Sequence, residues 1–325
     1  MAGLQVRSLL VTGANRGIGL GLVRQLLGMP NPPEWVFAAC RDPKGERAQV
    51  GLPHPGSPGM CPGAARTLGA LHREGTVPTG RCLRGHRALP SLLPMANPKG
   101  TSLGEHRGLP PPGTVRGVSH HGDTDLPCPG SAEVTDPASI KAAAARVGEQ
   151  LGGSGLNLLI NNAGIAKLNL LDTETLEDMS QVYTTNTVGP LLLSQAFLPL
   201  LKKAAQGSPG SALSCSKAAI INMSSYGGSI ASPSGWDLMQ VVSYRCSKAA
   251  LNMLTKCQSL GYREHGVLCA ALHPGWVQTD MGSSAGHTPP VTVDASARGM
   301  LKVLSSLSEK DTGTFLDWEG NVVPW

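Results

Sequence analysis

A tyrosine and a lysine stand four positions apart in the stretch VSYRCSKAAL, residues 242–251. If this stretch is helical, Tyr244 and Lys248 lie on one face of the helix, one turn apart. A neighbouring ammonium lowers the pKa of a tyrosine hydroxyl from about 10 toward neutral pH and makes it a usable general acid. Because a solvated helix face with two unrelated residues has the same spacing, the surrounding elements must decide between the two interpretations.

Short apolar runs typical of buried parallel strands recur along the chain and alternate with helical patterns. The runs are SLLVTG, EWVFAACRD, LNLLINNAG, KAAIINMSS, GVLCAALHPG and TGTFLDW. This alternation predicts an α/β fold with a doubly wound parallel sheet, the Rossmann fold. One further helix is expected to begin near Pro137, with Thr135 or Asp136 as its N-cap.

The segment TGANRGIG, residues 12–19, joins the first strand to the first helix. Gly13 allows a tight turn, Gly17 lets the backbone approach a pyrophosphate, and Gly19 lets the helix pack closely on the sheet. A plain strand–helix turn is the alternative. The segment predicts a dinucleotide-binding loop.

The end of the second strand bears on which nucleotide is bound. A carboxylate at that place accepts hydrogen bonds from the ribose of NAD, but this chain has Cys40 followed by Arg41, and Arg16 stands in the glycine loop. Two guanidinium groups suit the additional phosphate of NADP. Asp42 instead favours NAD. The alternative to a phosphate site is that both arginines are solvated surface residues.

Three other strands are followed by small or polar residues. The segments are NNAG (161–164), NMSSYGG (222–228) and HPGWVQTDMG (273–282). Each alone is compatible with an Asx turn, a serine cap or a plain loop. Because the carboxyl ends of parallel strands meet at one edge, the segments are expected to line one crevice.

With these motifs in order, the chain resembles the classical short-chain dehydrogenase/reductase family. The resemblance is carried by TGANRGIG, NNAG, TTNTVG, the serine before Y-x-x-x-K and PGWVQTD. Within the family, the sniffer-type carbonyl reductases and C-factor-like proteins are most similar, in CRDP, VTDPASI, INMSSYGGSI, YRCSKAALNML and the ending GNVVPW. The resemblance covers residues 1–48 and about 132–325.

The resemblance implies NADPH-dependent reduction of a small aldehyde, ketone or quinone by hydride transfer. It implies that Tyr244 donates the proton, that Lys248 lowers the pKa of Tyr244 and holds the nicotinamide ribose, and that Ser225, rather than Ser224, hydrogen-bonds the carbonyl. Asn186 is implied to position Lys248 through a water.

The resemblance also implies a set of cofactor contacts. Among them, Val277 and Thr279 hold the carboxamide, residues 162–164 line the adenosine side, and residues 133–134 lie beside the adenine. The full set is Gly13, Asn15, Arg16, Gly17, Ile18, Gly19, Arg41, Glu133, Val134, Asn162, Ala163, Gly164, Tyr244, Lys248, Pro274, Gly275, Val277 and Thr279.

Residues 49–131 differ in composition from the rest of the chain. They contain half of the 26 prolines and six of the nine histidines, but no Phe, Trp, Tyr or Ile. This composition predicts a low-order Pro/Gly-rich segment, where the family has about one helix and one strand. We therefore expect one Rossmann-type catalytic domain from residues 1–48 and 132–325, interrupted by 49–131.

The origin of this segment has two interpretations. It is either a disordered insertion or the product of a translated intron or mispredicted exon, and the abrupt change of composition at both ends favours the second. Either way, an edge of the sheet and part of the adenosine pocket are expected to be affected. The predicted catalytic residues all lie outside the segment.

Composition excludes several other classes of function. The net charge of +5 comes without a long Lys/Arg run, so no nucleic-acid partner is expected. No stretch approaches the roughly 20 apolar residues of a membrane span. The eight cysteines form no C-x-x-C pair, which indicates the reducing cytoplasm and no structural zinc.

No metal is expected at His120, His121 and Cys128 with Cys61 or Cys82, because no pair has ligand spacing. A small carbonyl compound is the expected partner. A homodimer through residues 179–204 and 243–262 and a monomer both stay open.

Two alternatives to a reductase also stay open. One is a non-catalytic dinucleotide-binding or signalling protein on the same fold, and the other is a non-functional product with a damaged sheet. Intact Ser225, Tyr244 and Lys248 argue against the first. Trp236 and Met239 are candidates for walls of the substrate pocket, although a packed tryptophan is an equal reading of Trp236.

Overall fold

The computed structural model describes residues 3–41, 133–208, 210–284 and 286–325. The predicted insertion at 49–131 lies outside the described residues. The same holds for Asp42 and for the metal candidates Cys61, Cys82, His120, His121 and Cys128.

Six parallel strands form one sheet in the described part of the chain, in the order β2-β1-β3-β4-β5-β6. The predicted doubly wound parallel sheet is thus confirmed, and β2 forms one edge of it within the described residues. The strands are β1 (Ser8–Thr12), β2 (Trp35–Ala39), β3 (Leu158–Asn161), β4 (Ala219–Met223), β5 (Leu268–His273) and β6 (Phe315–Asp317).

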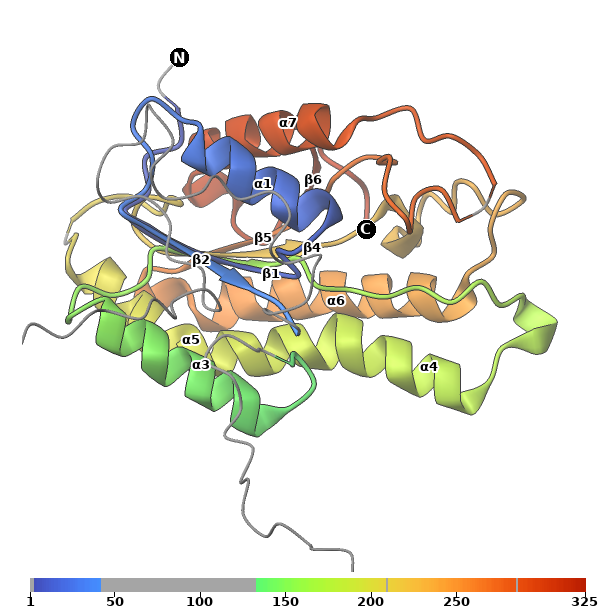
Figure 1. Ribbon diagram of the computed structural model, residues 1–325, viewed down its shortest axis with the longest axis horizontal. Helices are drawn as coiled ribbons and strands as arrows, with labels where there is room; N and C mark the ends of the chain where they lie inside the picture. Colours follow the sequence, from blue (N-terminus) through green and yellow to red (C-terminus); the bar gives the residue numbers. More distant parts are fainter. Residues whose placement is uncertain (1–2, 42–132, 209, 285) are drawn as a thin grey trace, which may run out of the picture. The chain divides into compact units, whose positions relative to one another are not determined.

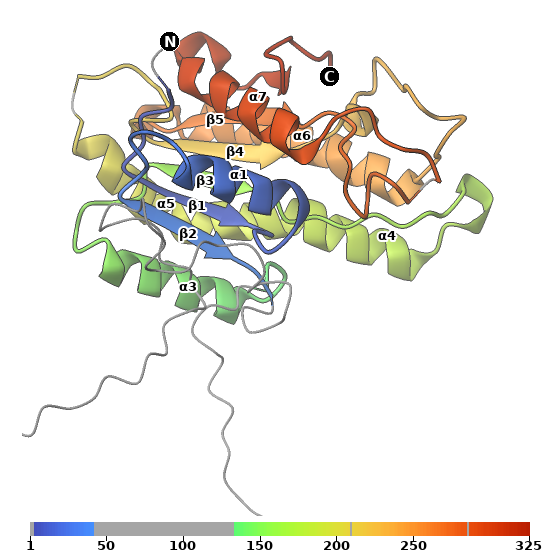
Figure 2. The ribbon, with the colours of Figure 1, turned by 45° about the horizontal axis from the view of Figure 1, so that its top comes forward.

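Helices cover both faces of this sheet (Figures 1 and 2). The helices α1 (Gly17–Leu27) and α7 (Val293–Ser306) lie on one face. On the other lie α3 (Pro137–Gln150), α5 (Gly189–Gln206) and α6 (Val242–Gly261), with the short α4 (Leu176–Tyr183) packed against α6.

The strands are mostly apolar because both of their faces are buried. Leu9 and Val11 point into the core under α1 and α7, whereas Leu10 points into the core under α3 and α5. Alternate apolar residues of β1, β2, β3 and β4 therefore enter two different cores. This explains why the strand segments are continuous apolar runs rather than alternating ones.

Two helix starts show how local sequence sets the elements. Asp136 caps α3, because its carboxylate accepts hydrogen bonds from the amides of Ala138 and Ser139, and Pro137 stands in the first turn, as predicted. The sequence predicts one helical stretch from Leu176 to Ala204, but a π-helical turn over Thr184–Val188 separates α4 from α5.

Pro190 stands at the start of α5 and has no amide hydrogen to donate to the preceding turn. The wider turn places Asn186 at its centre, where the side chain is fully buried. In the described residues, no helix is both long and apolar enough to span a bilayer.

Candidate active site

The loops that follow β1, β3, β4 and β5 meet at the carboxyl edge of the sheet, on the right-hand side of Figure 1. The Thr12 hydroxyl at the end of β1 accepts hydrogen bonds from the amides of Asn162 and Ala163, each at 3.0 Å. Arg16 and Asp280 join the first and last of these loops through an ion pair of 3.0 Å. The structure thus brings together segments that lie far apart in the sequence.

The glycine loop leaves room that side chains would fill. Gly13 and Gly17 have φ of +64° and +51°, a region that favours glycine. A Cβ at Gly19 would overlap the Gly13 carbonyl oxygen. Helix α1 then begins at Gly17 with no side-chain cap from any described residue and no acid in its first turn. Such a helix start fits the pyrophosphate of a dinucleotide.

Asn162 fastens this loop to the neighbouring strand. Its side-chain amide donates to the carbonyl oxygens of Thr12 at 2.8 Å and Gly13 at 3.3 Å. The sequence predicted that Asn162 lines the adenosine side, together with Ala163 and Gly164. The structure adds a structural task for its side chain, which holds the glycine loop in place.

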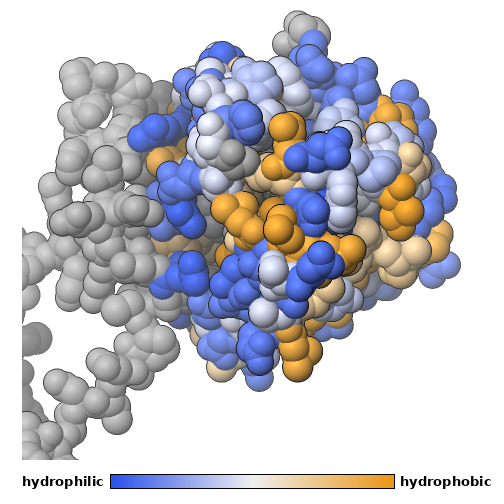
Figure 3. Space-filling view, turned by 90° about the vertical axis from the view of Figure 1, so that its right-hand side faces the viewer, coloured by the Kyte–Doolittle hydropathy of each residue, from blue (hydrophilic) through white to orange (hydrophobic). Residues whose placement is uncertain are grey.

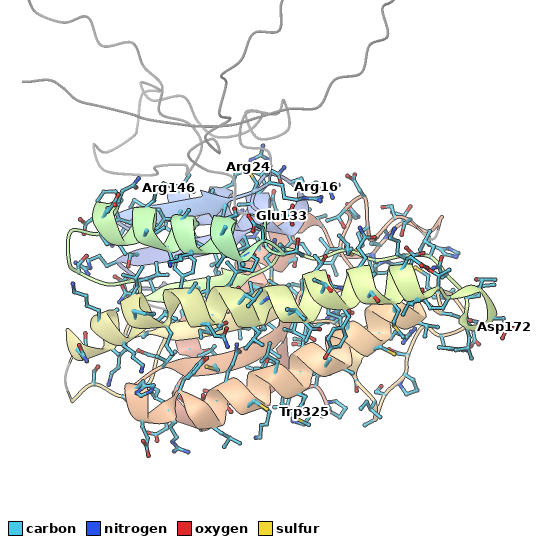
Figure 4. The ribbon with its side chains drawn as sticks, turned by 90° about the horizontal axis from the view of Figure 1, so that it is seen from below. Arg16, Arg24, Glu133, Arg146, Asp172 and Trp325 are labelled. Atoms are coloured by element: carbon cyan, nitrogen blue, oxygen red, sulfur yellow. The ribbon has the colours of Figure 1, made fainter. Side chains whose placement is uncertain are left out.

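The two arginines predicted to hold a phosphate are exposed and paired. Arg16 contacts Asp280, and Arg41 lies 3.9 Å from Glu133. Figure 4 shows where Arg16 and Glu133 lie relative to the helices. Asp280 is a partner that sequence reasoning missed, since it stands 264 positions away from Arg16. A contact between residues so far apart in the sequence leaves no pattern in the residues around either of them.

The other residues predicted to contact the cofactor near these arginines are half-buried or buried. Asn15 and Ile18 are half-buried on either side of Arg16 and Gly17, and Ile18 packs against the core under α1. Val134 is buried, and its backbone and side chain lie against Gly189 at the start of α5.

Tyr244 and Lys248 both lie on α6, as predicted. The buried Lys248 ammonium donates to the Met223 carbonyl oxygen at 2.6 Å and lies 5.5 Å from the centre of the Tyr244 ring. A Cβ at Gly164 would lie 3.7 Å from this ammonium, so the glycine of NNAG keeps the space beside it open.

The two adjacent serines point in different directions. The buried Ser224 hydroxyl contacts the Asn252 side-chain oxygen at 2.5 Å. The Ser225 hydroxyl accepts a hydrogen bond from the Gly227 amide at 3.1 Å and interacts with the Tyr244 hydroxyl. Of the two serines, Ser225 therefore faces the tyrosine.

Asn186 connects the loop after β3 to α6. Its side-chain oxygen accepts from the Ile165 amide at 2.9 Å, and its amide donates to the Ile165 carbonyl at 2.8 Å and to the Ser247 hydroxyl at 3.0 Å. Ser247 directly precedes Lys248, so Asn186 anchors the turn of α6 that carries the lysine. The predicted link to Lys248 through a water stays a prediction.

Burial controls the protonation of the central pair. It lowers the pKa of Lys248 to about 8. It raises the pKa of Tyr244, while the contact with Ser225 acts in the opposite direction. In this structure the pKa of Tyr244 is therefore raised rather than lowered, because burial removes water from around its charged form. The predicted lowering of this pKa by Lys248 stays a prediction. Tyr244 consequently keeps its proton at neutral pH.

The loop after β5 folds back on the glycine loop. The Pro274 carbonyl accepts a hydrogen bond from the Ser296 hydroxyl of α7 at 2.5 Å. Gly275 has φ +88°, and a Cβ there would lie 3.0 Å from the Trp318 indole nitrogen. These contacts fix the direction in which the chain leaves the strand.

Further along this loop, Val277 is buried and forms a β-bridge with Val291. A Cβ at Gly17 would lie 3.3 Å from the Thr279 methyl group, so Thr279 lies directly over the start of α1. Thr279, which is predicted to hold the carboxamide, therefore lies beside Gly17, which is predicted to lie against the pyrophosphate.

Sequence reasoning missed a cluster beside Ser225. The Tyr226 ring lies 4.1 Å from the ring of buried His273, and the Tyr226 hydroxyl donates to Asp317 at 3.2 Å. The Tyr226 amide donates to His273 Nδ1 at 3.3 Å. Burial lowers the pKa of His273 to about 4, although the Asp317 charge acts to raise it. His273 and Asp317 end adjacent strands, and that position is the signal that could have found them.

A cavity of about 390 Å³ opens beside the start of α6. Trp236 and Met239, which the sequence offered as walls of the substrate pocket, both line this cavity, and whether it receives the substrate stays a prediction. Figure 3 shows apolar side chains gathered on this face of the molecule. Within the described ranges, no three His, Cys, Asp or Glu side chains are grouped so that they could hold a metal ion.

Comparison with known proteins places this arrangement among oxidoreductases. The family model for short chain dehydrogenase matches residues 127–290. The C-signal protein of Myxococcus xanthus is 37% identical over 173 residues, which are 52% of this chain and 93% of that protein.

Two solved structures cover nearly the whole chain. The NADPH-bound carbonyl reductase from chicken fatty liver has 52% sequence identity and a TM-score of 0.72, over 99% of this chain and 100% of that chain. The carbonyl reductase Sniffer of D. melanogaster has 29% identity and a TM-score of 0.70, over the same shares of the two chains.

Proposed function

This chain belongs to the short-chain dehydrogenase family, and from that premise we propose that it reduces small carbonyl compounds to alcohols with NADPH. The observation that carries the proposal is the meeting of Ser225, Tyr244 and Lys248 beside the glycine loop at one edge of the sheet. The printed description of the chicken liver structure supports the same reaction and cofactor.

The cofactor side suits NADPH in its shape and charge. The backbone of Gly13–Gly19 and the uncapped start of α1 hold the pyrophosphate, and Arg16 and Arg41 hold the additional phosphate. Lys248 and Thr279 hold the nicotinamide end. When bound, NADPH supplies the hydride that is added to the carbonyl carbon.

The proton comes from Tyr244. Because burial raises its pKa, its hydroxyl stays protonated at neutral pH and donates to the carbonyl oxygen as the alcohol forms. The Ser225 hydroxyl accepts from the Gly227 amide and keeps its own hydrogen for the same oxygen.

Lys248 stabilises the charge that this transfer leaves behind. With a pKa of about 8 it is positively charged at pH 7, and its ammonium lies 5.5 Å from the Tyr244 ring centre. A cation at this place favours the phenolate over the phenol and so aids proton release.

We also propose that residues 1–48 and 132–325 form one catalytic domain. Arg41 and Glu133 flank the stretch outside the described residues and lie 3.9 Å apart. The two described ranges therefore meet at their adjoining ends, which supports one domain built from both.

The experiment follows NADPH oxidation by the purified full chain with an aldehyde, a ketone and a quinone, beside thermal unfolding with NADPH or NADH. We expect turnover in the parent chain and in Tyr183→Phe, an exposed tyrosine on α4. Tyr244→Phe is expected to lose activity by about 10²–10⁴-fold while NADPH still raises its unfolding midpoint.

Two other results would contradict the proposal. A rise in the midpoint with NADPH but no turnover of any carbonyl would indicate a non-catalytic nucleotide-binding protein. No shift with either nucleotide would mean that the chain lacks a working cofactor site.

A further inference from the structure

Arg245 directly follows Tyr244, yet its side chain serves the loop that precedes α6. Its Nε donates to the Gln240 carbonyl at 2.8 Å, and its Nη2 donates to the carbonyls of Met239 at 3.0 Å and Ser234 at 3.1 Å. The guanidinium carbon also lies 5.6 Å from the centre of the Trp236 ring. One half-buried side chain therefore ties both ends of the loop 234–241 to the catalytic helix.

The loop needs such an anchor because of its backbone. Gly235 has φ +71°, and Val241 has φ +36° and ψ +53°, a conformation that β-branched residues avoid. Residues held in such conformations persist only where surrounding contacts determine them. The planar fork of arginine can bind several carbonyl oxygens at once, which a lysine ammonium does with less geometric control.

The anchored loop is one wall of the 390 Å³ cavity. Its apolar members are Trp236, Leu238, Met239 and Val241, with the polar Asp237 and Gln240 among them, and Leu168 and Leu170 line the cavity from the loop after β3. The Gln240 side-chain oxygen accepts from the Leu171 amide at 2.8 Å and joins the two loops.

A second hydrogen bond between these elements lies at the first turn of α6. Glu174 accepts a hydrogen bond from the Ser243 amide at 2.9 Å, one residue before Tyr244. Both walls are thus fastened to the part of α6 that carries the tyrosine.

We propose that Arg245 is a positioning residue that holds the loop 234–241 as the apolar wall of the substrate cavity, so that the protein selects carbonyl compounds bearing an aryl or branched alkyl group. The substrate part of this inference rests on the proposed function. The wall receives the apolar group, while the carbonyl oxygen faces Ser225 and Tyr244.

The test uses the full chain with NADPH and compares an aromatic aldehyde, benzaldehyde, with a small one, propanal. Arg245→Met keeps the apolar stem and removes the fork, and we expect it to raise KM for benzaldehyde about tenfold while kcat changes less than about twofold. KM for propanal should stay unchanged. Arg245→Lys should give an intermediate KM, and Trp236→Ala should reproduce the rise in KM.

Arg263→Met is the matched control, because this exposed arginine pairs with Glu309 away from the cavity. Hydrogen exchange of the amides of 234–241 is measured in parallel and should become faster in Arg245→Met only. Unchanged exchange in that variant would overturn the anchoring role. An equal loss for both aldehydes, carried by kcat, would overturn the assignment of substrate selection.

The two readouts separate this inference from the proposed function. If the parent chain reduces no carbonyl, the proposed function and the substrate class both fall, while hydrogen exchange still decides whether Arg245 holds the wall. If Arg245→Met does not fold, Trp236→Ala decides the substrate class, since Trp236 is partly exposed and its removal leaves the core intact.

Discussion

The two sides of the crevice are built by different means. On the nucleotide side, contacts come from the strand ends themselves, through the Thr12 hydroxyl, the Asn162 amide and the backbone around Gly13. On the substrate side, two long loops are fastened by the side chains of Arg245, Gln240 and Glu174.

The nucleotide side is held in position mainly by the sheet next to it, whereas the substrate side is held by contacts with other elements. A strand end is fixed by its sheet, so a motif of eight residues there carries most of its own geometry. A loop is fixed only by whatever it contacts. The nucleotide side is therefore sensitive to small backbone-filling changes, whereas the substrate side is sensitive to the loss of individual long side chains.

The largest expected effect tests the backbone side. In Gly19→Ala the new methyl group overlaps the Gly13 carbonyl oxygen, and neither backbone segment can move away without breaking the loop. We expect the free energy of NADPH binding to weaken by about 3–4 kcal/mol, which is a loss of about 10²–10³-fold in affinity, measured by calorimetry.

Gly261→Ala is the control for this substitution. This glycine ends α6, and a Cβ there meets none of the described residues within 4 Å. Its nucleotide affinity should equal that of the parent chain. Equal affinity in Gly19→Ala would show that the loop is more compliant than its close packing indicates.

A second prediction concerns His273, which ends β5 next to the end of β6, between the nucleotide side and the substrate side. His273 has a folded pKa of about 4, below its value of 6.5 when exposed. Between these values the unfolded chain binds more protons, so stability falls as the pH drops from 6.5 through 4. We expect this group to account for a loss of about 2–3 kcal/mol in the free energy of unfolding, measured with urea at several pH values.

His273→Asn isolates this contribution. The asparagine oxygen can replace Nδ1 as acceptor for the Tyr226 amide, but it does not titrate. The variant should show a shallower loss of stability between pH 6.5 and 4. A slope equal to that of the parent chain would assign the loss to other groups.

A smaller effect tests charge on the nucleotide side. Arg16→Ala removes one of the two guanidinium groups proposed to hold the additional phosphate of NADPH. We expect about a tenfold loss of NADPH affinity with little change for NADH, measured as the ratio of the two dissociation constants. Arg263→Ala, which breaks an equally exposed ion pair, should leave the ratio unchanged. Equal losses for both nucleotides would place Arg16 elsewhere on the cofactor.

The smallest effect tests the fastening of the substrate side. Glu174→Ala removes the acceptor for the Ser243 amide at the first turn of α6. We expect a loss of about 1 kcal/mol in the free energy of unfolding, measured by thermal unfolding. Asp172→Ala changes an exposed carboxylate of the same loop, labelled in Figure 4, and should have less effect. If both variants behave alike, the joint between loop and helix contributes nothing measurable.

Particular residues show how far the sequence could be read. Asp136 before Pro137 predicted a capped helix, and the cap is present because the contact spans only two or three residues. Tyr244 and Lys248 were predicted to share a face for the same reason. The rise that burial causes in the pKa of Tyr244 was not predicted, since burial depends on what packs around α6.

The sequence by itself determined the strands, the helices and the glycine loop of this protein, because each follows from contacts among neighbouring residues and from the repeat of apolar positions. Only the tertiary structure decided that Arg16 meets Asp280, that Tyr226 packs on His273, and that Arg245 holds the loop before its own helix. These contacts join elements whose separation along the chain leaves no local trace, and they form only when packing brings the carboxyl ends of the strands together.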